Sequence, residues 1–499
     1  MTGEGALAKT LKANGVALAA GVYGDPCTSL LRSLSEAGLH VEISVEEKTA
    51  MAQAQGASVV GARAAAVFKQ VGVNVASDPL VNAAIHGCGA GLLVFLGDDP
   101  GAAKSTTEQD SRWYARLSEL PVLTPHNADH LCRSAVEGLE LSEELGLPVL
   151  LQVTSRLTKA TDPAGDYRAR TQGRFDRDRP WGRFMLDRHK YLLQELYPKL
   201  LARVEDSALH RVKRTEGDDG VISCGGVSQL VQAENHFALG YAYPLPEKRL
   251  AQFLAGLKRV LVVEEVAPVV EEAVGALAAA QGLKVQVLGR LSGHLPRLGP
   301  LDQAQLDAAF SLHPRGWNFE VNVQPTGDIF QLPCGGFEPL YLALDAALPE
   351  GYPVAGDVGC SILHGYFPPQ VIDTAYALGT SIATACGMSS NGRKGVAVIG
   401  DTGFLHSGVT ALLNAVEHGH NVLVIIIHNA ISGMTPGHLD IPGMHRIRAL
   451  AVACGVDAID ECDVQTDAVE SIQALIERRL GAHGVHVIIA KGKGKTWGS

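Results

Sequence analysis

Short apolar runs that end in small polar residues recur along this chain, and an Ala- and Leu-rich stretch follows most of them. Two of these runs are "GVAVIGD", which ends at Asp401, and "NVLVIIIHN", which ends at Asn429. Apolar runs without polar alternation are typical of strands that are buried on both faces. Strands that alternate with helical stretches predict parallel α/β units. This pattern therefore predicts parallel sheets covered by helices.

The same pattern divides the chain into three α/β sets. Further strands are expected in "GVALAAGVYG", "AAAVFKQVG", "GLLVFLGDDPG" and "PVLLQVTSR", and a second set contains "GVISCGG", "RVLVVEEVAP" and "KVQVLGRL". Between Leu157 and Gly220 the composition shifts to Arg, Asp, Lys and Trp, which predicts an irregular connector followed by a helix. A length of 499 residues agrees with roughly three domains. We expect domains at 1–165, 220–315 and 316–499, with the connector at 166–219.

Composition excludes several classes of partner and site. The chain has 42 Lys and Arg against 53 Asp and Glu, without a concentrated basic face, so neither nucleic acid nor an anionic membrane is an expected partner. The N-terminal stretch lacks the apolar core of a signal peptide, and no apolar run reaches the ~20 residues that span a bilayer. The nine cysteines include no C-x-x-C pair, which argues against zinc fingers, disulfide scaffolds and iron–sulfur clusters. A soluble cytoplasmic protein is expected.

Asp401 and Asn429 fall at the tips of two neighbouring strands. Ligands of parallel α/β sheets lie beyond the carboxyl ends of the strands. Two side-chain oxygens there suit Mg²⁺, which takes few protein oxygens together with the phosphates of a ligand. Gly400 and Gly403 allow a diphosphate to approach the backbone, and the helix N-terminus that follows favours negative charge. The alternative is that Asp401 only caps a helix and Asn429 only closes a turn.

The motifs around these residues resemble those of the thiamine diphosphate-dependent 2-oxoacid oxidoreductases, in particular the alpha subunit of indolepyruvate ferredoxin oxidoreductase. They include "GDTGFLHSGVTALLNAV", "NAISGMTPG" and "GDVGCSILHGYFPP", and further matches are "VEEKTAMAQAQGAS", "KQVGVNVASDPL" and "VLVVEEVAPVVEEAV". The resemblance follows nearly the whole chain in order. It implies a pyrimidine-binding domain (1–165), a transketolase C-terminal-like middle domain (220–315) and a diphosphate-binding domain (316–499).

In enzymes of this family a glutamate hydrogen-bonds the aminopyrimidine ring of the cofactor and promotes its activation. The resemblance assigns this role to Glu47 in "VEEKTAMAQAQGAS", with its neighbour Glu46 as the competing candidate. The ordinary alternative for Glu47 is a solvated acidic residue in the first turn of a helix. Because the family builds each site from two chains, a homodimer with active sites at the subunit interface is expected.

The resemblance also assigns the residues that hold the metal and the cofactor. Mg²⁺ ligands are Asp401, Asn429 and the backbone carbonyl of Ile431. The other cofactor-binding residues that it implies are Asp357, Gly359, Cys360, Gly400, Thr402, Gly403, Ser432, Gly433 and Met434.

This chain departs from the family at the expected substrate side of the site. Gln70 replaces a histidine, Cys334 is retained from a cysteine-rich segment in which Gly336 replaces a histidine, and His364 stands where the family has none. The ferredoxin-like C-x-x-C repeats of the family's alpha subunits are also absent from the sequence. Gln70, His364 and the family residue His406 are the candidate catalytic residues there, and ordinary loop placement is the alternative for His364.

Three functions compete. The first is non-oxidative decarboxylation of a 2-oxo acid, with an arylpyruvate such as indolepyruvate or phenylpyruvate expected from the family. The product is released as an aldehyde or joined to a second carbonyl substrate as an acyloin, and a histidine supplies the proton. The second is the alpha component of a 2-oxoacid:ferredoxin oxidoreductase of the indolepyruvate type, whose iron–sulfur clusters lie on a partner chain. The third is a catalytically silent paralogue, which the presence of Glu47, Asp401 and Asn429 argues against. The lack of cluster ligands favours the first.

Overall fold

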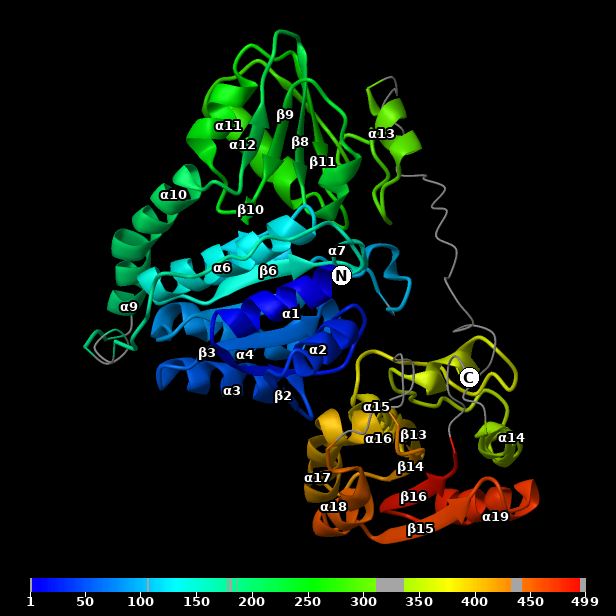
Figure 1. Ribbon diagram of the computed structural model, residues 1–499. Coiled ribbons are helices and arrows are strands. Elements are labelled where there is room, and N and C mark those ends of the chain that lie inside the picture. The colour runs from blue at the N-terminus through cyan, green and yellow to red at the C-terminus, as the bar shows by residue number, and fades with distance from the viewer. Residues whose placement is uncertain are drawn as a thin grey trace. The chain divides into compact units, whose positions relative to one another are not determined.

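A computed structural model describes residues 2–105, 107–176, 179, 182–184, 186–310, 336–431 and 442–493. The chain divides into two compact units, Met1–Gln324 and Pro325–Ser499. The first unit contains two sheets and the second contains one (Figure 1). All three sheets are mainly parallel and flanked by helices, so the predicted α/β fold class is confirmed.

The first sheet has seven strands in the order β10-β5-β6-β4-β3-β1-β2. All neighbours pair in parallel except β10 and β5, which are antiparallel. The strands are β1 (Val16–Gly21), β2 (His40–Ile43), β3 (Arg63–Lys69), β4 (Leu92–Gly97), β5 (Val122–Leu123), β6 (Val149–Val153) and β10 (Tyr241–Tyr243). β3, β4 and β6 are the predicted apolar runs, and their side chains are buried on both faces.

Two layers of helices cover this sheet (Figure 1). α1, α2 and α6 pack together in one layer, and α3, α4 and α5 pack together in the other. Their bounds, with two short helices, are α1 (Gly3–Ala13), α2 (Cys27–Glu36), α3 (Glu47–Val59), α4 (Gln70–His86), η1 (Pro100–Ala102), α5 (Arg112–Ser118), α6 (Ala128–Leu145) and α7 (Ser155–Thr158). The N-termini of α3 and α4 follow β2 and β3, and therefore lie at the carboxyl edge of the sheet.

After α7 the chain runs without regular structure to residue 176, and a helical segment then leads into the second sheet. This matches the predicted irregular start followed by a helix. The helical segment comprises α9 (Leu186–Tyr191), the π-helical turn η2 (Leu192–Leu196) and α10 (Tyr197–Asp206).

The second sheet has the order β12-β11-β8-β9-β7, with β7 antiparallel to β9. Its strands are β7 (Arg211–Lys213), β8 (Asp219–Cys224), β9 (His236–Leu239), β11 (Arg259–Val263) and β12 (Gln286–Leu288). Its helices are η3 (Gly226–Leu230), α11 (Glu247–Leu254), α12 (Val269–Ala280) and α13 (Gln303–Ala309). A buried ion pair network joins it to the first sheet, since Arg112 pairs with Asp110 at 2.6 Å and with Glu264 at 2.9 Å.

The third sheet has the order β13-β14-β16-β15 and is entirely parallel. Its strands are β13 (Gly395–Gly400), β14 (Val422–His428), β15 (Ala458–Asp463) and β16 (Val485–Lys491). Alternate residues of β13 and β14 enter two separate apolar clusters on opposite faces of the sheet. This explains why both runs are apolar at nearly every position.

Helices cover both faces of the third sheet. α14 and α19 pack together in one layer, and α15, α17 and α18 form the other. The bounds are α14 (Glu338–Ala347), η5 (Cys360–Gly365), α15 (Ser381–Met388), η6 (Ser389–Asn391), α16 (Asp401–Gly403), η7 (Phe404–Gly408), α17 (Val409–Glu417), η8 (Met444–Arg446), α18 (Ile447–Ala453) and α19 (Val469–Leu480). Within the described ranges, no helix is both long enough and apolar enough to span a membrane.

The structure contains strands that the sequence patterns did not identify. β10 falls within 220–315, the range expected to form the middle domain, yet it pairs with β5 at the edge of the first sheet. Both strands are only two or three residues long, so neither shows a recognisable period. The edge of the first sheet is therefore completed by a strand from a later part of the chain.

Candidate functional site

Asp401 lies at the tip of β13 and begins a continuous helical segment that runs through α16, η7 and α17. Its side chain is buried. Oδ1 accepts a hydrogen bond from the backbone N–H of Thr402 at 2.8 Å, and Oδ2 accepts one from Ala430 at 2.9 Å. His428 Nδ1 lies 3.3 Å from Oδ2. The carboxylate is therefore fixed by groups from both neighbouring strand ends.

Asn429 follows directly after β14. Gly400 pairs with Ile427 in the parallel register, so Asp401 and Asn429 reach the same edge of the sheet, as expected. Asn429 Oδ1 accepts a hydrogen bond from the backbone N–H of Ile431 at 3.1 Å, and Ala430 between them has a φ of +56°. This tight turn is the ordinary role that sequence reasoning offered as the alternative. It leaves a lone pair on Oδ1, so the turn does not exclude metal binding.

The donors at this edge suit a hard cation. They are the Asp401 carboxylate and the Asn429 amide oxygen, both of the kind that Mg²⁺ prefers, and the family resemblance adds the backbone carbonyl of Ile431. Within the part of the chain that the structure describes, no cluster of three or more His, Cys, Asp and Glu side chains could hold a metal. A metal at this site would therefore depend on amide and carbonyl oxygens as well as on Asp401.

Two glycines leave open space beside this edge. Among the described residues, a Cβ built at Gly400 or at Gly359 would meet nothing within 4 Å. Gly400 is the N-cap of the helical segment that begins at Asp401, and the first turn of a helix favours an anion. The N–H of Thr402 in this turn is already used, because it donates to Asp401 Oδ1. Gly403, by contrast, is closely packed, because a Cβ there would lie 2.6 Å from Asp357 Oδ1.

Asp357 holds together the loop that precedes η5. Its carboxylate is buried and accepts hydrogen bonds from the backbone N–H groups of Gly379 at 2.8 Å and Ser381 at 3.1 Å. Burial raises the pKa of Asp357 to about 6, although these two bonds favour the charged form. Since both carboxylate oxygens bind the protein's own backbone, Asp357 is suited to shaping the loop around Gly359. Cys360, the first residue of η5, is partly exposed.

The two histidines predicted to act in catalysis differ in their surroundings. His406 lies in η7, where its Nδ1 is 3.1 Å from Ser407 Oγ. His364 in η5 is only 1% exposed, and its ring stacks on Tyr341 of α14 with centroids 3.5 Å apart. Burial lowers the pKa of His364 to about 4, partly opposed by the backbone of Pro369. At neutral pH its imidazole is therefore neutral.

Four predicted residues cannot be placed. Ser432, Gly433 and Met434, expected beside the cofactor, lie outside the described residues, as does Cys334. Gly336, which follows Cys334, is described and has a φ of +107°.

The structure separates the two glutamates that sequence reasoning left in competition. Glu46 is the N-cap of α3, and its carboxylate accepts hydrogen bonds from the backbone N–H groups of Thr49 at 2.9 Å and Lys48 at 3.2 Å. Glu47 is 7% exposed and packs against Gly72 in the first turn of α4. Glu46 therefore has a local structural role, whereas Glu47 is a buried acid placed between two helix N-termini.

Gln70 begins α4 and is fully buried. Its Nε2 donates a hydrogen bond to Ser105 Oγ at 2.8 Å, in the loop that follows β4. Sequence reasoning selected Gln70 but gave no role to Ser105 or to Asp99, to which Ser105 is bonded. In the sequence, Asp99 lies at the end of the expected strand segment "GLLVFLGDDPG".

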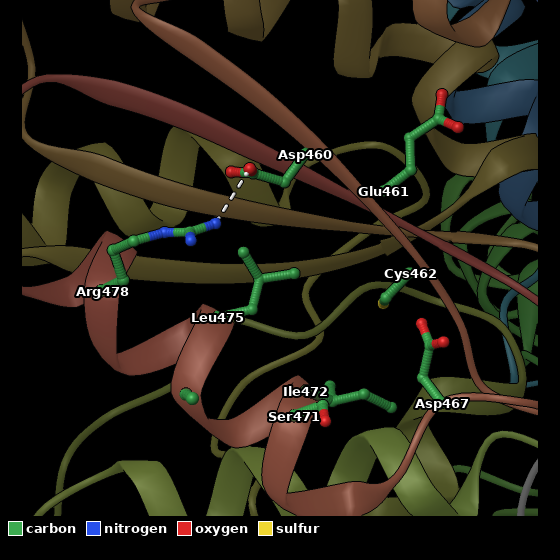
Figure 2. A pocket seen from close by; sticks show the side chains of 9 residues that line it. Asp460, Glu461, Cys462, Asp467, Ser471, Ile472, Leu475 and Arg478 are labelled. Carbon is green, nitrogen blue, oxygen red and sulfur yellow. Dashed lines mark hydrogen bonds and ion pairs between the residues drawn. The ribbon is translucent and has the colours of Figure 1, made fainter.

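A shallow pocket lies elsewhere, between β15 and α19. Figure 2 shows its acidic rim and Asp460, which is bonded to Arg478 at 3.1 Å. Its lining residues include none of the predicted site residues. The pocket therefore adds nothing to the candidate site.

Two family models match parts of this chain. A model described as "Thiamine pyrophosphate enzyme, N-terminal TPP binding domain" matches residues 1–110, which include Glu47 and Gln70. A model described as "Thiamine pyrophosphate enzyme, C-terminal TPP binding domain" matches residues 357–490, which include Asp401 and Asn429. Thiamine pyrophosphate is the same compound as thiamine diphosphate.

Similar curated proteins extend the likeness to nearly the whole chain. "Indolepyruvate oxidoreductase subunit IorA" of Methanothermobacter marburgensis is 32% identical over 536 residues, covering 98% of this chain and 86% of that protein. The protein of the same name from Archaeoglobus fulgidus is 29% identical, covering 98% of this chain and 85% of that protein.

Among solved structures, 2-oxoglutarate:ferredoxin oxidoreductase from Magnetococcus marinus is 16% identical. The match covers 58% of this chain and 61% of that chain, with a TM-score of 0.46. A score this low carries no argument about the site.

Proposed function

This chain belongs to the thiamine pyrophosphate enzyme family, among the relatives of indolepyruvate oxidoreductase subunit IorA, and on that premise we propose that it is the alpha component of a 2-oxoacid:ferredoxin oxidoreductase of the indolepyruvate type. Its substrate is a 2-oxo acid, its cofactors are thiamine diphosphate and Mg²⁺, and its electrons pass to iron–sulfur clusters on a partner chain. The observation that carries this proposal is the 32% identity to a protein named as an oxidoreductase subunit over 98% of the chain.

This proposal places the oxidoreductase alpha component ahead of the non-oxidative decarboxylase, which is the reverse of the order expected from the sequence. Sequence reasoning put non-oxidative decarboxylation first because the cysteine pattern of clusters is missing. The relatives favour the oxidative alternative, since those named here carry the name of an oxidoreductase subunit. In the oxidative reaction a 2-oxo acid anion and a coenzyme A thiol give an acyl thioester, CO₂, one proton and two electrons. In the non-oxidative reaction the same anion takes up one proton and gives an aldehyde and CO₂.

The donor atoms at the carboxyl edge of the third sheet support a cofactor site. In this proposal Asp401, Asn429 and the carbonyl of Ile431 bind Mg²⁺. The first-turn N–H groups after Gly400, other than that of Thr402, bind the diphosphate. Asp357 keeps the loop around Gly359 in place. When bound, the cofactor supplies the electron sink for breaking the bond to the carboxylate carbon.

Glu47 is proposed to act on the aminopyrimidine ring. A buried carboxyl is suited to sharing a proton with a ring nitrogen, and its packing against Gly72 restricts its position. Glu47 and Asp401 belong to different compact units. We propose, as the family implies, that each site combines Glu47 of one chain with Asp401 of another in a homodimer.

One experiment separates the two reactions. The purified chain is incubated with thiamine diphosphate, Mg²⁺ and a panel of 2-oxo acids that includes indolepyruvate and phenylpyruvate, with and without an artificial electron acceptor. CO₂ release that requires the acceptor supports the oxidoreductase. Aldehyde or acyloin formed without acceptor would instead restore the decarboxylase, and no cofactor binding by calorimetry would refute both.

A further inference from the structure

Gln70 has one buried polar atom without a hydrogen-bond partner in the part of the chain that the structure describes. The residue is 1% exposed at the first position of α4. Its Nε2 donates to Ser105 Oγ at 2.8 Å and lies 3.4 Å from the carbonyl oxygen of Thr107. Its Oε1 has no hydrogen-bond partner among the described residues. A buried carbonyl oxygen without a donor is costly, and native proteins rarely tolerate one without a reason.

The Asp99 carboxylate determines which atom of the Gln70 side-chain amide has no hydrogen-bond partner. Asp99 Oδ2 accepts from Ser105 Oγ at 2.6 Å and from the backbone N–H of Lys104 at 2.9 Å. Since a carboxylate cannot donate, the single hydroxyl proton of Ser105 goes to Asp99. Ser105 Oγ must then accept its bond from Gln70, and the amide must present NH₂ to Ser105.

The flipped orientation of the Gln70 side-chain amide, in which Oε1 and Nε2 exchange places, would be unfavourable. Oε1 would then face the lone pairs of Ser105 Oγ and of the Thr107 carbonyl, both of which need a donor. The chain from Asp99 through Ser105 to Gln70 therefore holds Oε1 away from this loop, as an acceptor that cannot donate.

Gln70 and Gly72, the residue that Glu47 contacts, both lie in the first turn of α4. Gly72, against which the Glu47 carboxyl packs, lies two positions beyond Gln70 in the first turn of α4. The first turn of α4 therefore carries two features suited to a ligand, a buried acid against its backbone and an unused amide oxygen.

We propose that Gln70 is a ligand-positioning residue, whose Oε1 accepts a hydrogen bond from a neutral N–H donor of the molecule bound beside Glu47. The inference rests on the proposed function, which supplies two N–H donors. One is the indole N–H of an indole-bearing 2-oxo acid, and the other is the exocyclic amino group of the aminopyrimidine. If the donor is the indole, Gln70 determines substrate specificity.

The test compares Gln70→Met with the matched control Gln55→Met. Gln55 in α3 also donates through its Nε2, to the carbonyl oxygen of Pro79 at 2.8 Å, but it is not part of the Asp99 chain. Both variants are titrated with thiamine diphosphate and Mg²⁺ by calorimetry. CO₂ release is then measured with an artificial acceptor on indolepyruvate, its N-methylindole analogue and phenylpyruvate, the last two of which lack the N–H.

The expected results distinguish the two donors. If the indole N–H is bound, Gln70→Met lowers kcat/KM for indolepyruvate by roughly tenfold, leaves the other two substrates unchanged and leaves the cofactor Kd unchanged. If the amino group is bound, the cofactor Kd rises by a similar factor and all three substrates lose activity equally. Either result supports the proposal, provided that Gln55→Met behaves as wild type.

Two results would overturn it. If Gln70→Met binds cofactor and turns over all three substrates like Gln55→Met, then Oε1 has no ligand role, while the proposed function stands. If the wild type itself binds no thiamine diphosphate, the proposed function fails and this inference fails with it.

Should Gln70→Met not fold by circular dichroism, Ser105→Ala provides the second test. It frees the amide to rotate, and it should produce the same pattern with a smaller effect. Wild-type behaviour of Ser105→Ala would then reject the proposal.

Discussion

Asp401 Oδ2 accepts a hydrogen bond from the backbone N–H of Ala430 at 2.9 Å, so one carboxylate ties the end of β13 to the turn that follows β14. This bond makes Asp401 part of the fold as well as a candidate metal ligand. Replacement by alanine would leave the N–H of Ala430 without its partner and would mix the two roles. Asparagine removes the charge but keeps an oxygen for one of the two backbone N–H groups that the carboxylate binds, so it disturbs the fold less than alanine does.

Asp401→Asn is expected to weaken Mg²⁺-dependent binding of thiamine diphosphate by roughly tenfold or more, since the substitution removes the negative charge that attracts the divalent cation. Unfolding stability should change by no more than about 1–2 kcal/mol. Calorimetry with and without Mg²⁺ measures the first effect, and thermal unfolding measures the second. Asp460→Asn, in β15 of the same sheet, serves as the control. Unchanged cofactor affinity in Asp401→Asn would refute the metal site.

Glu47→Gln is expected to bind thiamine diphosphate but to slow the exchange of the thiazolium C2 proton by roughly 100-fold, because an amide cannot share a proton with the ring nitrogen as a carboxyl does. NMR of the bound cofactor follows this exchange. Glu46→Gln is the matched control. It should leave exchange unchanged and reduce stability by at most about 1 kcal/mol, as the loss of an N-cap does. The opposite pattern would move the catalytic role to Glu46.

Gly72→Ala tests whether Glu47 needs this close approach to α4. A Cβ at Gly72 would lie 2.8 Å from Glu47 Cδ and 2.9 Å from Cγ, so the carboxyl must move. We expect a stability loss of about 1–3 kcal/mol and slow C2 exchange, as in Glu47→Gln. Gly56→Ala in the exposed part of α3 meets no atom of the described residues within 4 Å and should be neutral or stabilising by up to about 1 kcal/mol. Wild-type exchange in Gly72→Ala would show that the position of Glu47 is not critical.

His364→Phe should make the second unit less sensitive to acid. The pKa of His364 is about 4 in the folded protein and 6.5 when exposed, so the unfolded chain binds a proton at pH values where the folded chain does not. Wild-type stability therefore falls as the pH drops from 6.5 to 4, by up to about 3 kcal/mol from this residue. Phenylalanine keeps an aromatic ring against Tyr341 without this loss. Hydrogen exchange of amides in α14, measured at pH 7 and pH 5, reports the difference. Equal acid sensitivity would mean that His364 is exposed in solution.

The proposed homodimer predicts complementation. Glu47→Gln and Asp401→Asn are each expected to be inactive, but a mixture in which subunits exchange should regain part of the wild-type activity, because some sites then receive both intact residues. Activity after mixing and sedimentation with cofactor present are the two measurements. A monomer in sedimentation, or a mixture as inactive as its components, would contradict sites shared between chains.

The sequence predicted the strands that are long and apolar, together with the residues at their tips. β13 and β14 could be identified because both faces of the sheet are buried, which leaves every position apolar. Contacts between segments that are distant in the chain leave no such pattern in the sequence. The stacking of His364 on Tyr341, and the contact of Glu47 with Gly72, join elements whose local sequences say nothing of each other. Sequence reasoning could therefore select Glu47 from a resemblance, but only the fold distinguishes its surroundings from those of Glu46.

The antiparallel pairing of β10 with β5 limits how this protein can be made and divided. The edge of the first sheet at β5 is covered only when the chain has been synthesised past Tyr243, well beyond the last parallel strand, β6. Until then the nascent chain exposes an open strand edge, which is a site for pairing with another chain. A fragment that ends at the connector would keep that edge exposed permanently. It should aggregate, whereas a fragment that extends through the second sheet should remain in solution.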